Sequence, residues 1–242
     1  MARCSREAVQ EGGGEYGMVA LVCENETHLQ HLVDSIHEFL GHSSDGSKSD
    51  SAHDRAAVEQ VLIANINSKN QVVLSGSIER IHTLLTNLKQ YGGHDPRSVR
   101  LNSDSPFHSP IMKPAEEYMK KWMREGRRAT GEDIVAFPGI LPCISNVTAR
   151  PFESQQQVVE LLARQAVATV RWWDSVKYLD QEEKVRRWIG IGPGKVGRNL
   201  VGKEVGMKGA VKGGGVWGLS APREVEEIMR GLDDTETAED EH

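Results

Sequence analysis

The order of apolar segments over residues 16–104 constrains the fold of this chain more than any other feature of its sequence. Short apolar runs with the length of a strand alternate there with segments whose apolar residues recur at helical spacing. We expect strands over residues 18–23, 58–66, 71–75 and 98–101, and helices over residues 29–40, capped by Asn25 or Thr27, and 78–88. This order, strand-helix-strand-strand-helix-strand, is that of a ferredoxin-like fold.

A polar stretch interrupts this part of the chain at residues 41–56. It is rich in Ser, Asp and Gly and carries too few apolar residues to bury a core. We therefore expect an exposed, disordered insertion within a ferredoxin-like small subdomain of residues 16–104. Residues 1–15 are then a segment that connects it to a larger subdomain.

Residues 105–232 alternate helices and strands in a way that indicates an α/β fold. The expected elements are a helix over 112–122, a polar loop over 124–132, strand-like stretches broken by prolines over 134–144, helices over 154–168 and 172–179, a strand over 185–191, glycine-rich segments over 192–194 and 206–219, and a helix from Pro222 to Met229 capped by Ser220. Residues 233–242 are expected to form an acidic, frayed tail.

Charge and cysteine content exclude several classes of protein. The net charge is −6 and Lys and Arg form no dense cluster, so the charge distribution gives no support for binding to nucleic acid. It does not exclude an acidic protein partner, which a local basic patch could bind. The 3 cysteines form no C-x-x-C pair and no disulfide framework, which indicates a reducing, intracellular compartment. No apolar run has the length needed to cross a membrane, and the first residues lack the apolar core of a secretory signal.

His108 lies in a turn between an expected strand and an expected helix, where catalytic groups are often displayed. On position alone, a structural histidine is the commoner interpretation. His28 and His31 are three residues apart on a helix but have no third ligand nearby, so no metal site is expected. Residues 190–195 resemble a phosphate loop but lack its full glycine spacing and its Ser or Thr, so a strand-to-helix turn is the simpler interpretation.

The residues around His108 decide between these interpretations. Residues 106–115, P-F-H-S-P-I-M-K-P-A, resemble the histidine motif of the malonyl-CoA:acyl-carrier-protein transacylases. Further segments resemble the same family in the right order: residues 65–76 (N-I-N followed by Q-V-V-L-S-G), 146–147 (N-V), 162–176, 192–196 (G-P-G-K-V) and 216–217 (V-W). The resemblance covers roughly residues 7–230.

This resemblance implies acyl transfer by a ping-pong route. In the family a serine on a G-H-S-x-G elbow attacks the malonyl thioester, and a histidine takes the serine proton and returns it to the leaving thiol. The acyl group then passes to the phosphopantetheine thiol of acyl carrier protein. By resemblance His108 is that histidine, and the main-chain carbonyl of Gln165 orients it in place of an acid.

The resemblance also assigns polar residues to the substrate channel. Asn65, Asn67 and Gln71 match polar positions that line it, although asparagines in a hairpin also suit turn chemistry alone. The expected partners are malonyl-CoA, as a substrate, and acyl carrier protein. No covalently bound cofactor is expected.

Two groups that the family needs have no match here. The serine elbow belongs before the ferredoxin-like part, and the arginine that holds the malonyl carboxylate aligns at Met1 or before it, with Arg3 and Arg6 out of register. Ser43 follows Gly41 and His42 as in an elbow, but this segment follows a helix and has Asp45 where an elbow needs glycine. We therefore expect this polypeptide by itself to be inactive.

The sequence thus predicts a ferredoxin-like subdomain inserted in an incomplete α/β-hydrolase-like subdomain. The leading hypothesis is malonyl transfer from malonyl-CoA to acyl carrier protein in fatty-acid synthesis. Two alternatives are an acyltransferase domain of a polyketide synthase and a non-catalytic binding module that keeps the ferredoxin-like part for partner contact. The long insertion and the acidic tail are typical of a eukaryotic, organellar form, so a mitochondrial location is expected.

Overall fold

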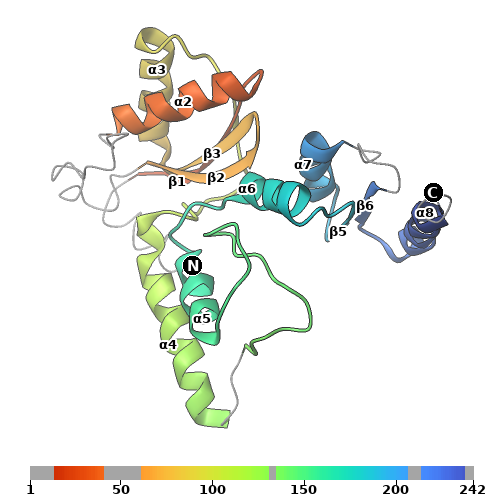
Figure 1. The fold of residues 1–242 in the computed structure, drawn as a ribbon. Helices are drawn as coiled ribbons and strands as arrows, with labels where there is room; N and C mark the ends of the chain where they lie inside the picture. The colour runs from red at the N-terminus through yellow and green to blue at the C-terminus, as the bar shows by residue number, and fades with distance from the viewer. Residues whose placement is uncertain (1–13, 41–60, 131–134, 207–213, 238–242) are drawn as a thin grey trace. The chain divides into compact units, whose positions relative to one another are not determined.

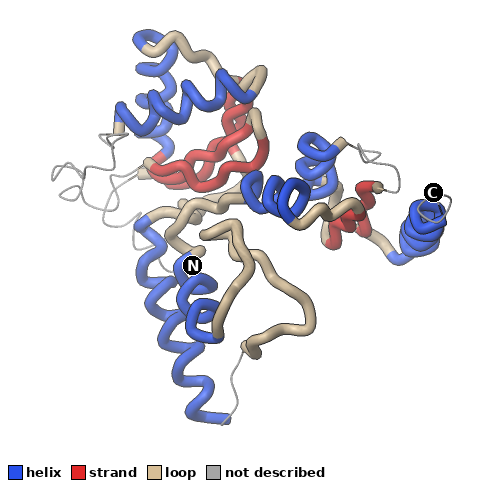
Figure 2. The backbone as a smooth tube through the Cα atoms, viewed as in Figure 1, coloured by secondary structure: helices blue, strands red, loops and turns tan. Residues whose placement is uncertain are grey.

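The computed structural model describes residues 14–40, 61–130, 135–206 and 214–237, and the chain divides into two compact units, residues 1–172 and 173–242 (Figure 1). The predictions for residues 1–13 and 41–56, including those for Arg3, Arg6 and Ser43, lie outside the described residues. Helices and strands alternate along the chain (Figure 2), and the predicted α/β class is confirmed.

A four-stranded antiparallel sheet is the centre of the first unit. Its strands are β1 (Tyr16–Val22), β2 (Leu62–Ser68), β3 (Gln71–Ser77) and β4 (Arg97–Arg100), and they lie side by side in the order β2-β3-β1-β4. Helix α2 (Glu26–Phe39) connects β1 to β2, and α3 (Ile78–Tyr91) connects β3 to β4. Both helices cover the same face of the sheet (Figure 1).

Alternating side chains give this sheet two buried faces. Toward the helices, Leu21 and Leu74 pack with Leu32, Ile36 and Ile81, all of which are essentially inaccessible to solvent. The opposite face carries a smaller cluster of Met18, Ala20, Ala64 and Val73, against which Leu101 and Phe107 pack. Because Phe107 precedes His108, this second cluster attaches the histidine segment to the sheet.

Two helices follow in the rest of the first unit. A 3₁₀ turn (Pro110–Met112) leads into α4 (Lys113–Thr130), and Ser154 caps α5 (Gln155–Arg164) by accepting a hydrogen bond from the Gln157 amide at 3.1 Å. The predicted polar loop over 124–132 is wrong, since α4 continues to Thr130. A single glycine within a helix costs only about 1 kcal/mol, and the arginines and alanine that follow Gly126 are good helix formers.

The strand-like stretches predicted for residues 134–144 are also absent from the part of this segment that the structure describes, which begins at residue 135. The backbone forms a loop there, and Ile140 and Leu141 are exposed. Pro138 and Pro142 have no N–H to donate to a neighbouring strand. The one bridge at the end of this segment joins Ile144 to Pro151.

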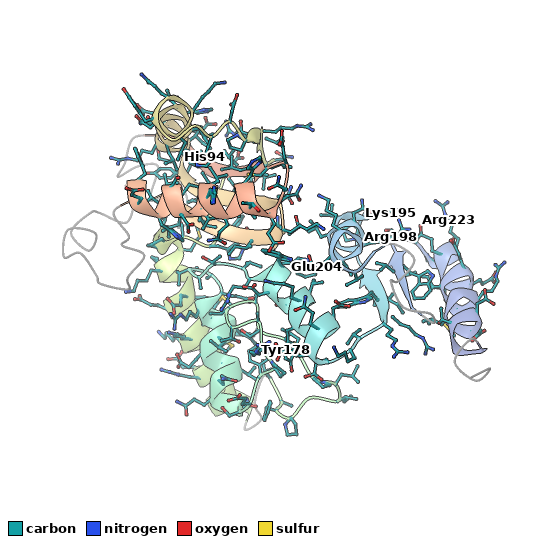
Figure 3. All side chains as sticks on the ribbon, turned by 45° about the horizontal axis from the view of Figure 1, so that its top comes forward. His94, Tyr178, Lys195, Arg198, Glu204 and Arg223 are labelled. Atoms are coloured by element: carbon teal, nitrogen blue, oxygen red, sulfur yellow. The ribbon has the colours of Figure 1, made fainter. Side chains whose placement is uncertain are left out.

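The second unit is built on two short parallel strands, β5 (Arg187–Ile191) and β6 (Gly215–Leu219). Around them are α6 (Trp172–Lys177), which begins at the boundary between the units, a π-helical turn (Tyr178–Glu182), α7 (Val196–Val205), a 3₁₀ turn (Pro222–Glu224) and α8 (Val225–Thr237). The Trp173 indole donates to Glu204 at 2.6 Å, and Arg198 donates to the Val216 carbonyl at 3.3 Å. Figure 3 labels the two α7 residues of these contacts, Arg198 and Glu204. These contacts attach α7 to α6 and to β6.

The C-terminal helix differs from the prediction at both ends. Glu224 accepts hydrogen bonds from the amides of Ser220 and Ala221 at 2.6 and 3.1 Å, so a glutamate, and not the Ser220 side chain, caps this turn. These two backbone hydrogen bonds lower the pKa of Glu224. The acidic segment predicted to fray from residue 233 is helical as far as Thr237. Among the described helices, none combines the length and the apolarity needed to span a membrane.

Candidate active site

His108 occupies a tight turn whose backbone is held by its neighbours. Its φ angle is 58°, in the left-handed region that residues other than glycine seldom adopt. The fully buried Ser109 donates from its hydroxyl to the Pro106 carbonyl at 2.6 Å, and the Met112 amide donates to the Ser109 carbonyl at 2.9 Å. A strained backbone that is so restrained by its surroundings is typical of functional sites.

The main-chain carbonyl of Gln165 meets this turn from another part of the chain. Its oxygen lies 2.7 Å from Nδ1 of His108. Gln165 is the C-cap of α5, and the last carbonyls of a helix have no partner within the helix, so this oxygen is available to the imidazole. A carbonyl can only accept, so Nδ1 donates and Nε2 of the neutral ring is left without its proton. The arrangement therefore presents Nε2 as a proton acceptor.

One apolar cluster holds both halves of this pair. Ile111, Met112 and Ala115 follow His108, Ala166 follows Gln165, and all four are buried together with Tyr16 of β1. Phe107 and Val167, which also neighbour the pair, pack against the same cluster. The distance between the imidazole and the carbonyl is thus fixed by packing on both sides.

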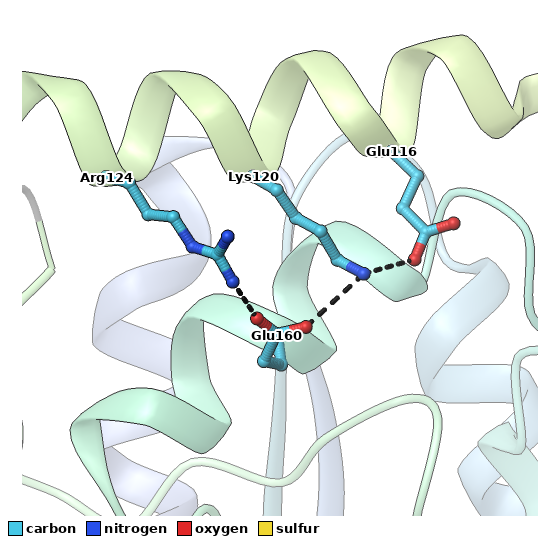
Figure 4. A network of polar contacts seen from close by, with 4 residues as sticks. All are labelled: Glu116, Lys120, Arg124 and Glu160. Carbon is cyan, nitrogen blue, oxygen red and sulfur yellow. Dashed lines mark hydrogen bonds and ion pairs between the residues drawn. The ribbon is translucent and has the colours of Figure 1, made fainter.

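Ion pairs join the two helices that carry this cluster and the Gln165 carbonyl (Figure 4). Glu160 of α5 lies 3.3 Å from Lys120 and 2.5 Å from Arg124, both on α4, and Lys120 also reaches Glu116 at 2.8 Å. Partial burial raises the pKa of Glu160, but the hydrogen bonds and charges of Lys120 and Arg124 outweigh it, and the net pKa lies below the usual value. Glu160 is therefore a carboxylate at neutral pH, bonded to both cations.

The other predicted site residues lie on strands β2 and β3. Asn67 donates to Gln71 through their side-chain amides at 3.3 Å. Val73 belongs to the cluster against which Phe107 packs, and Asn65 lies opposite Val73 in the register of β2 and β3. Gln71 is two residues before Val73 and therefore lies on the same face of the sheet. The polar side chains thus lie on the face that contacts Phe107. A parallel bridge joins Asn65 to Val170, with the Ile66 amide donating to the Val170 carbonyl at 3.0 Å.

The structure thus brings the predicted residues together in two sets. His108 and Gln165 are in direct contact, and Asn67 and Gln71 contact each other. The backbone around Val170 connects Asn65 to the segment that follows Gln165. Among the described residues, no cluster of three His, Cys, Asp or Glu side chains is placed to hold a metal.

Sequence reasoning missed two positioning residues. The buried Ser109 hydroxyl donates to the backbone of the His108 turn. The Asn146 carbonyl accepts from the Arg171 amide at 2.8 Å, and the Asn146 side chain donates to the side chain of Gln165 at 3.5 Å. Both stand inside motifs that the sequence analysis quoted, H-S-P and N-V. The motifs themselves were the only signal, because burial of a serine or an asparagine leaves no periodic pattern.

Comparison with known proteins gives consistent results. No family model matches the chain. It is 34% identical over 143 residues to the malonyl CoA-acyl carrier protein transacylase of Bacillus subtilis, which covers 59% of this chain and 42% of that protein. It is 36% identical to the polyketide biosynthesis malonyl CoA-acyl carrier protein transacylase BaeC of Bacillus velezensis, over 57% of this chain and 44% of that protein.

Solved structures agree over most of this chain. The Clostridium perfringens malonyl CoA-acyl carrier protein transacylase matches with a TM-score of 0.68 and 24% identity, over 97% of this chain and 63% of that one. The acyl-carrier-protein S-malonyltransferase of Bartonella henselae matches with a TM-score of 0.65 and 27% identity, over 96% and 63%. A type II polyketide malonyl-transacylase solved with its acyl-carrier protein matches with a TM-score of 0.66 and 22% identity, over 96% and 62%.

The homologues and structural neighbours of the chain are thus malonyl-CoA:acyl-carrier-protein transacylases. The chain spans less than half the length of the curated transacylases that it matches. The mitochondrial location expected from the insertion and the acidic tail is wrong, since these relatives of the transacylase family come from the bacteria Buchnera aphidicola, Bacillus and Synechocystis. The composition of an insertion or a tail does not by itself indicate a cell compartment.

Proposed function

We propose that this chain carries the general base of malonyl transfer from malonyl-CoA to the phosphopantetheine thiol of acyl carrier protein. The observation that carries the proposal is the contact between the Gln165 carbonyl and Nδ1 of His108 at 2.7 Å. It fixes the tautomer in which Nε2 can take a proton from a serine hydroxyl and return it to a leaving thiol. The histidine motif and the similarity to malonyl-CoA:acyl-carrier-protein transacylases support this role.

The polar set on the sheet is proposed to line the path of the substrate. Asn65, Asn67 and Gln71 lie on the sheet face against which Phe107, the neighbour of His108, packs. Amide side chains can donate to and accept from the amide and hydroxyl groups of a pantetheine arm. In this proposal their contribution is to binding and orientation, and none of them moves a proton.

We also propose a subdomain organisation. The element order β1-α2-β2-β3-α3-β4 and the antiparallel sheet order β2-β3-β1-β4 support a ferredoxin-like subdomain over residues 16–104. The parallel strands β5 and β6, with α7 between them in the chain, support a part of an α/β-hydrolase-like subdomain in the second half. His108 and Gln165 follow the first of these along the chain.

The nucleophile of this proposal is not among the 242 residues, since they contain no G-H-S-x-G sequence. By family resemblance, that serine and an arginine for the malonyl carboxylate complete the active site. The proposal therefore assigns no turnover to these 242 residues by themselves. A sensitive malonyl-transfer assay of the isolated polypeptide checks this point, and turnover would contradict it.

A chimera tests the role of His108 without depending on the missing residues. The segment of the Bacillus subtilis transacylase that corresponds to His108 and Gln165 is replaced by that of this chain, and transfer of labelled malonyl groups from malonyl-CoA to acyl carrier protein is measured. The proposal expects transfer by the chimera and a loss of about 10²–10⁴ in kcat in its His108→Ala variant. A folded chimera in which His108→Ala keeps full activity would overturn the proposal.

A second candidate differs in the carrier protein. The 36% identity to a polyketide biosynthesis transacylase supports a carrier protein of polyketide synthesis as the acceptor. The same chimera, assayed with carrier proteins of fatty-acid and of polyketide synthesis, distinguishes the two by the ratio of kcat/KM. A non-catalytic binding module is the outcome if neither carrier protein is malonylated while binding persists.

A further inference from the structure

Strand β2 departs from regular pairing at Ala64. Ile63 lies opposite Leu74 and Asn65 lies opposite Val73, so two steps along β2 match a single step along β3. The extra residue is a β-bulge, which moves the side chains that follow it to the other face of the strand. Asn65 therefore shares a face with Val73, whereas without the bulge it would point with Ile63 into the core beneath the helices.

The same bulge turns two successive carbonyls to one side of β2. In a regular strand the carbonyls of neighbouring residues point to opposite sides. Here the Ile63 carbonyl accepts from the Thr169 hydroxyl at 2.7 Å, and the Ala64 carbonyl accepts from the Val170 amide at 2.8 Å. Both of these β2 residues are buried, where a carbonyl without a partner is costly. Thr169 and Val170 thus supply the two donors that the bulge requires.

The two donors differ in how they depend on the sequence. The Val170 amide belongs to the main chain, as does the Val170 carbonyl, which accepts from the Ile66 amide at 3.0 Å, and almost any residue supplies such groups. The Thr169 donor belongs to a side chain, and a hydroxyl is a donor that an apolar side chain of the same size lacks. The identity of residue 169 therefore decides whether the Ile63 carbonyl keeps its partner.

We propose that Thr169 is a positioning residue, which holds the β2 bulge and so keeps Asn65 on the face of the sheet that contacts Phe107. This inference rests on the proposed function, in which Asn65 binds the pantetheine arm of the substrate. Thr169 itself contacts neither the arm nor the reacting atoms in this proposal. Its loss should weaken substrate binding, which raises KM, and should leave proton transfer by His108 unchanged.

An action through the Gln165 carbonyl is the alternative, because Thr169 lies only four residues after Gln165. The backbone between the two is held by its own contacts, since the amides of Val167 and Ala168 both donate to the Arg164 carbonyl at 3.0 Å. The residue that follows Gln165 is also buried in the apolar cluster of the site. The Gln165 carbonyl should therefore stay in place when the Thr169 hydroxyl is removed.

A chimera provides the kinetic test. Residues 61–172 of this chain, which contain β2 and Thr169, replace the corresponding segment of the Bacillus subtilis transacylase, and malonyl transfer is measured. Thr169→Val keeps the shape of the side chain without the hydroxyl. It should raise KM for malonyl-CoA by about three- to tenfold, as expected for one hydrogen bond, while kcat changes by less than about twofold.

Two further variants control this result. Thr169→Ser keeps the hydroxyl and should hold KM within about twofold of the parent chimera. Thr86→Val is the matched control, because the Thr86 hydroxyl also donates to a carbonyl, that of His82 at 2.8 Å, but at an exposed position of α3. It should change neither KM nor kcat.

The route through Asn65 is tested by a double-mutant cycle. Asn65→Ala should raise KM by itself, and Thr169→Val in that background should add less than about twofold, because the side chain that Thr169 positions is gone. An undiminished effect of Thr169→Val in the Asn65→Ala background would overturn the inference. A loss of kcat or a displaced pH profile of kcat would also overturn it, since either would place the action of Thr169 on Gln165 and His108.

Amide hydrogen exchange in the same chimera tests the structural step. Loss of the Thr169 hydroxyl should speed exchange of the Ile66 and Val170 amides by at least about threefold, whereas the Leu84 amide of α3 should be unaffected. Thr169→Ala removes the same hydroxyl and serves in all assays if the valine variant does not fold. Unchanged KM or unchanged exchange in a folded variant without the hydroxyl contradicts the inference. Full activity of the His108→Ala chimera contradicts the proposed function instead, so the two can fail separately.

Discussion

The carbonyl oxygen of Gln165 lies 2.7 Å from Nδ1 of His108, across 57 residues of sequence. A main-chain acceptor in this position differs from a carboxylate in one important way. It carries no titratable proton and cannot be removed by a side-chain substitution. The orientation of the imidazole therefore depends on the position of the backbone at the end of α5, and on the packing that holds this helix end against the His108 turn.

This dependence predicts that the Gln165 side chain is largely dispensable. In the chimera with the Bacillus subtilis transacylase, Gln165→Ala should lower kcat by less than about tenfold, because the hydrogen bond that its side chain accepts from Asn146, at 3.5 Å, is at the limit of such a bond. His108→Ala should lower kcat by about 10²–10⁴. Equal losses in the two variants would contradict orientation by the main chain.

The left-handed backbone of His108 predicts an unusual ranking of substitutions. With φ at 58°, asparagine adopts the same conformation with little strain, whereas a β-branched side chain is crowded there. His108→Val should be less stable than His108→Asn by about 1–2 kcal/mol. Urea denaturation of the two variants measures this difference. Stabilities that agree within error would mean that the turn relaxes out of the left-handed region.

Packing around the His108 turn predicts a large effect from a methionine that has no chemical role. Met112 is fully buried beside Ala166, so Met112→Ala leaves a cavity and should lower the free energy of unfolding by about 2–5 kcal/mol. Met229→Ala, at a residue that is 53% exposed, is the matched control and should change it by less than about 0.5 kcal/mol. Similar small losses in both would place the turn outside the core.

The fold of the first unit was predictable from the sequence to a useful degree because its signals are local. Apolar spacing located α2 and α3, and Asn25, one of two predicted caps, accepts the His28 amide at 2.9 Å. The predicted strand at 98–101 differs from β4 by one residue at each end. Periodicity responds to faces that are buried along a whole element, and α2 and α3 have such faces, whereas all four residues of β4 are exposed.

The failures have equally specific causes. Gly126 and the surrounding charges predicted a loop, yet α4 continues to Thr130, and ion pairs of Lys120 and Arg124 with Glu160 join it to α5. Residues 134–144 are apolar enough to suggest strands, but the prolines remove the donors that a strand needs. The contact between Arg124 and Glu160 spans 36 residues, so no local window contains it, whereas the prolines were visible in the sequence itself.

The site was predictable only through resemblance. Nothing in spacing or composition connects His108 with Gln165, and the motif around the histidine supplied the pairing. The hydroxyl of Ser109 under the turn and the approach of Asn146 to Gln165 went unnoticed, because each depends on burial and not on a pattern. The structure packs residues that follow His108 and Gln165, namely Met112 and Ala166, into one apolar cluster, which the sequence does not reveal.

The ion pairs between α4 and α5 predict a pH-dependent contribution to stability. The net pKa of Glu160 lies below the usual value of 4.5, because Lys120 and Arg124 outweigh the effect of partial burial. A carboxyl whose pKa is lowered on folding stabilises the folded state above its unfolded pKa and loses this effect as the pH falls through the folded value. Stability that depends on Glu160 should therefore be complete at neutral pH and disappear in acid.

Glu160→Gln tests this directly, because it keeps the size of the side chain and removes the charge. At pH 7 the variant should be less stable by up to about 1 kcal/mol, since the pairs are partly exposed to solvent. The difference should shrink as the pH falls through the lowered pKa of Glu160, and it should also shrink in 1 M salt, where charges are screened within about 3 Å. Glu117→Gln, an exposed carboxyl of α4 outside the network in Figure 4, should show neither trend. If both variants lose the same stability at every pH, the ion pairs do not hold α5, and the position of the Gln165 carbonyl depends on the apolar cluster alone.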